Sequence, residues 1–174
     1  MKWIAGRRGI INALSFLLFL APPKTNAQSV KFPNDRVNIS LPLAQLIVTS
    51  SFGWRNHPVL GERDFHQGTD LAARNEPCYA IMDGWIVETG HHPILGIFVR
   101  IDHGNIQSIY GHLSYALVKT GQHVLSGQPI GITGTSGRAT GEHLHFSIIC
   151  VDRYINPLLF LKAAIERQTS LLSH

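Results

Sequence analysis

Cysteine is scarce in this chain of 174 residues, which contains two copies, Cys78 and Cys150. Neither belongs to a Cys-x-x-Cys pair, which argues against a cysteine-ligated zinc site. Two interpretations of these residues stay open at this stage. They could form a disulfide, which would close a long loop and stabilise the fold by about 4 kcal/mol. They could instead be two buried free thiols, which behave as small hydrophobic side chains.

Charged residues are also few, and the positive excess lies at the start of the chain. The formal net charge is +4, from 15 Lys and Arg against 11 Asp and Glu. Residues 1–27 contain four of those 15 and none of the 11, so the later chain carries 11 of each sign. No stripe of Lys and Arg is left there, and we expect no nucleic-acid partner.

The chain lacks an apolar run that would span a bilayer comfortably, since roughly 20 residues are needed. An apolar run over residues 10–21 follows the positively charged Lys2, Arg7 and Arg8. Small residues at 25–27 come next, which is typical of a cleaved signal peptide rather than a membrane anchor. We therefore expect export to the periplasm or cell envelope, with no stable membrane span after cleavage before Gln28.

Short apolar runs separated by turn-forming residues fill most of the later sequence. We interpret residues 84–88, 97–101, 106–110 and 143–151 as β-strands. The turn signal Asp102-His103-Gly104-Asn105 joins the second to the third as a hairpin. Many short strands with frequent turns predict an all-β fold, a compact antiparallel sheet with a barrel-like form.

One short helix is predicted near the C-terminus. Asn156 can cap it, Pro157 suits its first position, and the following residues to Arg167 favour a helix. About 147 residues follow the signal peptide, which fits one domain with one core. We divide the chain into a signal peptide (1–27), an extended lead (28–46), the main domain (47–165) and a C-terminal tail (166–174).

Two histidine motifs are the strongest chemical signal among the ten histidines. They are His66-Gln67-Gly68-Thr69-Asp70 and His143-Leu144-His145. Residues two apart on a strand face the same side, so His143 and His145 point into one site. Gly68 lets the backbone bend so that His66 and Asp70 converge, and in an extended segment positions four apart also share a face.

These four side chains suit zinc hydrolysis. Zinc in hydrolytic sites usually takes three protein ligands and keeps a fourth position for water. One histidine is therefore left over as an acid or base, and the spacing alone leaves its identity open. His112, in Tyr110-Gly111-His112-Leu113, is a further candidate. Turn or core positions are expected for the other histidines, which are His57, His91, His92, His103, His123 and His174.

Several ordered segments from about Ser50 to Leu161 carry a family resemblance. They include Ser51-Phe52-Gly53-Trp54-Arg55, Phe65-His66-Gln67-Gly68-Thr69-Asp70, Tyr110-Gly111-His112-Leu113, Gly134-Thr135-Ser136-Gly137 and Gly141-Glu142-His143-Leu144-His145-Phe146. The chain resembles the LytM/lysostaphin-type zinc endopeptidases, which cleave peptide bonds in bacterial cell-wall peptidoglycan.

The resemblance implies a site and a function. It assigns one Zn²⁺ per chain to His66, Asp70 and His145, and it makes His112 and His143 the catalytic pair in a groove over the metal. Peptidoglycan peptides would be the substrate, and the sequence does not identify a protein partner. Two alternatives stay open: a non-catalytic wall-binding regulator of another hydrolase, and a peptidase that acts on glycine-rich proteins. The presence of all five residues favours an active enzyme.

Overall fold

The computed structural model describes residues 38–56 and 63–173, which contain twelve strands and one helix. The predicted signal peptide, most of the predicted lead, His57 and His174 lie outside the described residues. The elements are β1 (Val48–Ser50), β2 (Gly53–Asn56), β3 (Arg63–His66), β4 (Thr69–Ala72), β5 (Pro77–Tyr79), β6 (Gly84–His92), β7 (Gly96–Asp102), β8 (Ile106–Ala116), β9 (His123–Val124), β10 (Pro129–Thr133), β11 (His143–Cys150), β12 (Arg153–Ile155) and α1 (Pro157–Leu172).

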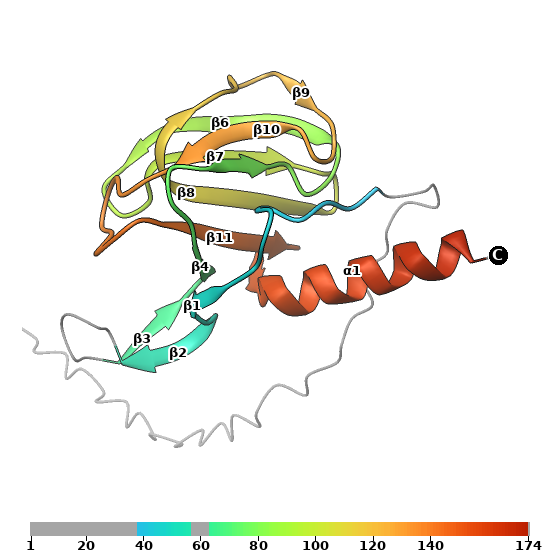
Figure 1. The fold of residues 1–174 in the computed structure, drawn as a ribbon, viewed down its shortest axis with the longest axis horizontal. Coiled ribbons are helices and arrows are strands. Elements are labelled where there is room, and N and C mark those ends of the chain that lie inside the picture. Colours follow the sequence, from blue (N-terminus) through green and yellow to red (C-terminus); the bar gives the residue numbers. More distant parts are fainter. Residues whose placement is uncertain (1–37, 57–62, 174) are drawn as a thin grey trace, which may run out of the picture.

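The strands form one large sheet and a separate hairpin. The main path of the sheet runs β1-β4-β11-β8-β7-β6-β9, while β10 joins β5 and β8, and β12 joins β11. Strands β2 and β3 pair with each other and project from the sheet (Figure 1). Every pairing among the described strands is antiparallel, which confirms the predicted fold class. The hairpin predicted across Asp102 and Gly104 joins β7 to β8, with Asp102 opposite Gln107.

The centre of the core lies along β8, which is buried over most of its length because β11 and β7 flank it. Tyr110 on β8 is fully buried, and its hydroxyl accepts a hydrogen bond from the backbone N–H of Ile81 at 3.0 Å. Ser108 donates a second hydrogen bond to this hydroxyl at 3.3 Å. The one polar atom of a large core side chain therefore has partners, as burial requires.

Helix α1 begins as predicted and continues beyond Arg167. The side-chain oxygen of Asn156 accepts hydrogen bonds from the backbone N–H groups of Leu158 and Leu159, and Pro157 occupies the first turn. No glycine or proline follows Arg167, and the helix extends to Leu172. Its apolar face packs into the core through Phe160, Leu161 and Ala164.

Residues 38–46, the described part of the predicted lead, pack against the sheet. Leu43 is buried in the core, and the carbonyl of Pro42 accepts a hydrogen bond from the N–H of Tyr79. The N–H of Ile39 donates to the side chain of Gln168 on α1 at 3.2 Å. No helix within the described residues is long and apolar enough to cross a membrane.

Both cysteines are free thiols, which decides between the two interpretations left open by the sequence. Cys78 on β5 is fully buried, and its Sγ donates to the carbonyl of Gly131 at 3.5 Å. Burial raises the pKa of the Cys78 thiol to about 12. Cys150, at the end of β11, is partly exposed.

The two thiols should therefore differ in reactivity. The thiolate is the reacting species, so we expect native Cys78 to be alkylated by iodoacetamide at pH 8 at least about 100-fold more slowly than Cys150. Peptide mass spectrometry after timed labelling measures both rates. Labelling in denaturant is the control, and there the two rates should converge. Equal rates in the native protein would contradict the burial of Cys78.

Candidate metal centre

Three sheet strands bring the predicted site residues together. Strand β11 lies between β4 and β8, with His145 directly opposite Asp70 on one side and Gly111 on the other. His66 is the last residue of β3, just before the turn into β4. All five residues predicted for the site, His66, Asp70, His112, His143 and His145, line one cavity.

Three of the five side chains could hold one metal ion, and they are the only such group within the described residues. His66 Nε2 lies 3.1 Å from His145 Nδ1 and 3.2 Å from Asp70 Oδ1. His145 Nδ1 lies 2.9 Å from the same Asp70 oxygen. These separations are close to the edges of a tetrahedron of ligands about 2.0–2.1 Å from a common centre, the distance at which zinc binds nitrogen and oxygen.

The orientation of the rings also fits a metal. His66 Nδ1 must carry its proton, because it donates to the carbonyl of Ser51 at 2.9 Å, and the lone pair of Nε2 then faces the cluster. The Nε2 of His145 lies 3.0 Å from the hydroxyl of Ser147, to which it can donate. Such outer hydrogen bonds fix the ring and the tautomer of metal-binding histidines. Two imidazoles and one carboxylate are a donor set that catalytic zinc uses.

Gly68 is needed here for space rather than for an unusual backbone angle. Its φ does not lie in the left-handed region. A Cβ at this position would lie 2.6 Å from His145 Cε1 and 2.6 Å from Ser147 Oγ. The turn between β3 and β4 can therefore pass close to the ring of His145 because residue 68 has no side chain.

Arg55 holds the outer side of the Asp70 carboxylate. Its guanidinium Nη1 lies 3.7 Å from Asp70 Oδ2 and donates to the hydroxyl of Ser50, while Oδ1 faces the histidines. Burial raises the pKa of Asp70, but the interactions with the adjacent imidazoles of His145 and His66 outweigh it and hold the pKa well below its ordinary value. The carboxylate is thus ionised, with one oxygen directed at the cluster.

His112 and His143 lie beside the cluster, with their ring centroids 4.6 Å apart. His112 Nδ1 donates to the carbonyl of Ser136 at 2.8 Å, and His143 Nδ1 donates to the carbonyl of Gly141 at 2.8 Å. Each ring therefore keeps its proton on Nδ1 when neutral. The Nε2 lone pair of each is left to accept a proton.

An irregularity in β8 sets the position of His112. Its φ is 61°, in the left-handed region that few residues other than glycine adopt. The pairing of β8 shifts register on both sides here, between Ile97 and Val99 of β7 and between Ile132 and Thr133 of β10. Such irregularities re-aim side chains near functional sites. Burial lowers the pKa of His112 to about 4, against the opposing effect of its hydrogen bond to Ser136.

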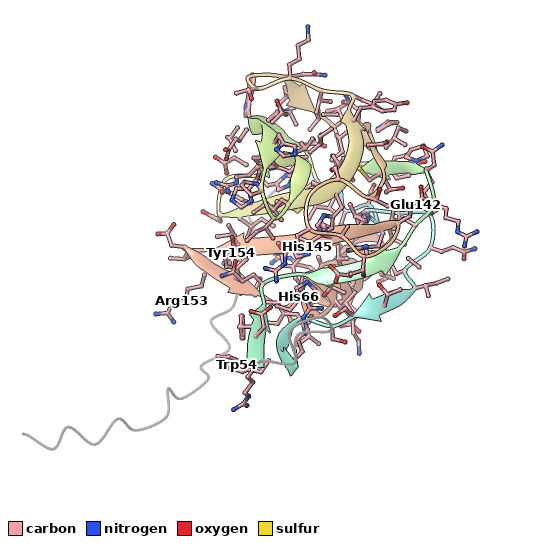
Figure 2. The ribbon with its side chains drawn as sticks, turned by 90° about the vertical axis from the view of Figure 1, so that its left-hand side faces the viewer. Trp54, His66, Glu142, His145, Arg153 and Tyr154 are labelled. Carbon is pink, nitrogen blue, oxygen red and sulfur yellow. The ribbon has the colours of Figure 1, made fainter. Side chains whose placement is uncertain are left out.

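The cavity over the cluster measures about 630 Å³ and confirms the predicted groove. It also contains charged and aromatic residues that the motifs did not single out, namely Arg55, Phe65, Arg100, Arg138 and Tyr154. Figure 2 shows Tyr154 and Glu142 on opposite sides of His145. Sequence patterns gave no signal for these residues, except that Arg55 and Phe65 belong to the segments that carry the resemblance.

Two histidines expected at turn or core positions have clear structural roles. His103 donates from Nδ1 to the carbonyl of Asp83 and bonds through Nε2 to Ser108, at 2.8 Å in each case. His92 Nδ1 accepts hydrogen bonds from the backbone N–H groups of Ile94 and Leu95. His92 also lines the groove, which the sequence did not predict.

Comparison with known proteins gives matches in sequence. Residues 64–157 match Peptidase family M23. Peptidoglycan DD-endopeptidase ShyA of Vibrio cholerae is 44% identical over 127 residues, which are 71% of this chain and 29% of that protein. DD-carboxypeptidase/endopeptidase Mpg of Neisseria meningitidis is 37% identical over 67% of this chain and 27% of its own length. The chain thus spans less than a third of these curated relatives.

Solved structures match over a similar region. A zinc-containing peptidase from Vibrio cholerae has a TM-score of 0.65 and 36% identity, over 70% of this chain and 39% of that one. The catalytic domain of the antimicrobial peptidase lysostaphin from Staphylococcus simulans has a TM-score of 0.62 and 30% identity, over 67% of this chain and 92% of that one. The second match therefore covers nearly the whole of the lysostaphin catalytic domain.

Replacing His145 tests the metal centre. We expect His145→Ala to lose its zinc, because it removes one of three ligands, whereas the unchanged protein should bind about one zinc per chain. Elemental analysis of both purified proteins after dialysis measures the ratio. His123→Ala, which changes an exposed histidine on β9, is the matched control and should keep its zinc. Full zinc content in His145→Ala would contradict the assignment.

Replacing Arg55 tests how Asp70 is held. Arg55→Gln removes the charge that faces Asp70 Oδ2, and outer partners of metal ligands typically contribute about 10- to 100-fold in metal affinity. We expect a loss of that size in a competition titration with a chromophoric chelator. Arg63→Gln is the control, because Arg63 lies over Trp54 on the same hairpin. Equal affinities in the two variants would show that Arg55 does not position the carboxylate.

Proposed function

This chain belongs to peptidase family M23, and from that premise we propose that it is a zinc endopeptidase that hydrolyses peptide bonds in bacterial cell-wall peptidoglycan. Its proposed ligands are His66, Asp70 and His145, and its proposed catalytic histidines are His112 and His143. The names of the curated relatives, which include peptidoglycan DD-endopeptidases, support this substrate class.

One observation carries the proposal. A three-ligand cluster that could hold a metal lies beside two histidines that each donate from Nδ1 to a backbone carbonyl, which leaves the lone pair on Nε2. The Nε2 of His143 lies 3.7 Å from Asp70 Oδ1, at the edge of the cluster. A structural zinc site has four protein ligands, whereas a catalytic site keeps a position open. Three converging donors next to two proton acceptors are the arrangement that hydrolysis requires.

The metal and the protein would divide the chemistry between them. Bound zinc would act as a Lewis acid toward the scissile carbonyl and lower the pKa of the attacking water. The groove holds the peptide across the cluster, so that its carbonyl lies near His112 and His143. The carbonyls of Ser136 and Gly141 keep both rings oriented with Nε2 toward the substrate.

The Nε2 atoms of His112 and His143 account for the proton transfers. One of them accepts the proton of the water as it attacks the carbonyl. Once protonated, an imidazole can donate a hydrogen bond to the developing negative charge on the carbonyl oxygen, and it can deliver a proton to the leaving amine. His112 and His143 share these tasks, and their ring separation of 4.6 Å allows both to face one substrate bond.

We also propose that the protein is exported and acts in the periplasm or cell envelope. The charged start, the apolar run over residues 10–21 and the small residues at 25–27 support removal of a signal peptide. Peptidoglycan lies in that compartment. An N-terminus at Gln28 in protein recovered from the envelope would test the cleavage site directly.

The function is tested by digestion of purified peptidoglycan with the zinc-loaded protein, followed by mass spectrometry of the released muropeptides. We expect cross-linked muropeptides to lose a peptide cross-link, and a chelator to abolish the reaction. Wall binding without cleavage would favour the regulator hypothesis. Release of products only from glycine-rich peptides would favour the other alternative and reject peptidoglycan as the substrate.

The catalytic role of His112 has its own test. His112→Asn suits the left-handed backbone, which asparagine tolerates better than most residues. We expect zinc content to stay at one per chain and the cleavage rate to fall by about 10²- to 10⁴-fold, since a positioned acid or base is lost. Loss of zinc in this variant would instead place His112 among the ligands, and an unchanged rate would remove it from catalysis.

A further inference from the structure

A second cavity adjoins the groove at His143. It measures about 510 Å³ and shares His143 and Thr140 with the larger cavity over the metal cluster. The two cavities therefore meet at a proposed catalytic histidine, which lines both. A peptide that crosses the cluster would extend into both, with the cleaved bond between them.

The second cavity lies where the paired strands β4 and β11 continue beyond the proposed metal ligands. His145 lies opposite Asp70, and His143 lies opposite Ala72. Burial alternates along this stretch, with Leu71 and Ala73 in the core and Asp70 and Ala72 on the other face. Arg74 follows just beyond the end of β4, in a bend before Asn75. It lines the cavity from the β4 side.

Two opposite charges line this cavity without internal partners. Arg74 and Glu142 are exposed, and no described residue forms a hydrogen bond or ion pair with the guanidinium of Arg74 or the carboxylate of Glu142. Glu142 comes directly before His143 and lies on the opposite side of His145 from Tyr154 (Figure 2). The third charged residue, Glu76, is turned toward the backbone, because its Oε1 accepts from the N–H of Arg74 at 3.3 Å.

We propose that this second cavity binds a zwitterionic residue of the substrate, with Arg74 pairing with its carboxylate and Glu142 with its ammonium group. The inference rests on the proposed peptidase function and names the substrate class for that site. A diamino acid in a stem peptide presents both charges on one carbon when its side chain is not cross-linked. A carboxylate matches the fork of a guanidinium, and an ammonium group matches a carboxylate. Arg74 and Glu142 thus determine specificity and take no part in the proton transfers.

The test uses three synthetic cross-linked stem peptides that differ in one head group. The first carries the free zwitterion, the second an amidated carboxylate and the third an acetylated amine. With the zinc-loaded full chain, we expect kcat/KM to fall by about tenfold for each neutralised peptide, the change that corresponds to one charge-assisted hydrogen bond. Arg74→Gln should cleave the zwitterionic and the amidated peptide equally well, but should still discriminate against the acetylated one. Glu142→Gln should cleave the zwitterionic and the acetylated peptide equally well, but should still discriminate against the amidated one.

Two matched controls separate this effect from a general change of charge. Lys119→Gln removes a positive charge, as Arg74→Gln does, and Glu166→Gln removes a negative charge, as Glu142→Gln does. Both control residues are exposed, and neither lines either cavity. Both controls should discriminate among the peptides as the unchanged protein does. Equal rates on all three peptides, or discrimination that persists in both cavity variants, would overturn the proposal.

Binding measured apart from cleavage distinguishes this proposal from the function on which it rests. Isothermal titration of the three peptides into zinc-loaded His112→Asn gives their affinities without turnover. The same titrations are made with Arg74→Gln and Glu142→Gln added to this background. Suppose that the unchanged protein cleaves none of the peptides, but that each added substitution removes the difference in affinity for its own neutralised peptide. The cavity assignment then holds and the peptidase function fails. Absence of both cleavage and discrimination would reject both.

Discussion

The register of β11 between β4 and β8 is the constraint on which the site depends. It places His145 opposite Asp70 and, on its other side, opposite Gly111, the residue before His112. Because side chains alternate along a strand, a slip of one residue would turn His143 and His145 into the core and Leu144 outward. The buried Leu144 and Phe146 oppose such a slip, since their burial requires the register that directs the histidines into the groove. The same apolar contacts therefore stabilise the sheet and align the proposed metal ligands.

Backbone carbonyls fix the orientation of the histidine rings in the site. His66, His112 and His143 each donate from Nδ1 to a main-chain carbonyl, of Ser51, Ser136 and Gly141. These acceptors are backbone atoms, so they cannot be lost by substitution of a side chain. Three imidazoles thus share one tautomer, although the roles proposed for them differ. The turns that provide the carbonyls are consequently part of the site, which explains why irregular segments flank the regular strands there.

Much of the fold and the membership of the site could be predicted from the sequence. Strand alternation placed His143 and His145 on one face, and Asn156 with Pro157 marked the start of the helix. Other features depend on contacts between distant residues. The left-handed backbone of His112 reflects the irregular pairing of β8 with both neighbours. The contact of Arg55 with Asp70 joins the β2–β3 hairpin to β4, and the hydrogen bond of the free Cys78 thiol joins β5 to Gly131 on β10. The chain bends at Gly68 as predicted, and the structure adds that the missing side chain makes room for His145.

The three donors of the cluster come from segments that are far apart in the chain. His145 is 75 residues from Asp70 and 79 from His66. A metal ion held by them would close a long loop, and closing such a loop restricts the unfolded chain much as a disulfide does. Neither described cysteine supplies that restraint. The proposed catalytic ion would then also act as a cross-link within the domain. The metal concentration would affect the stability of the folded protein as well as its rate of reaction.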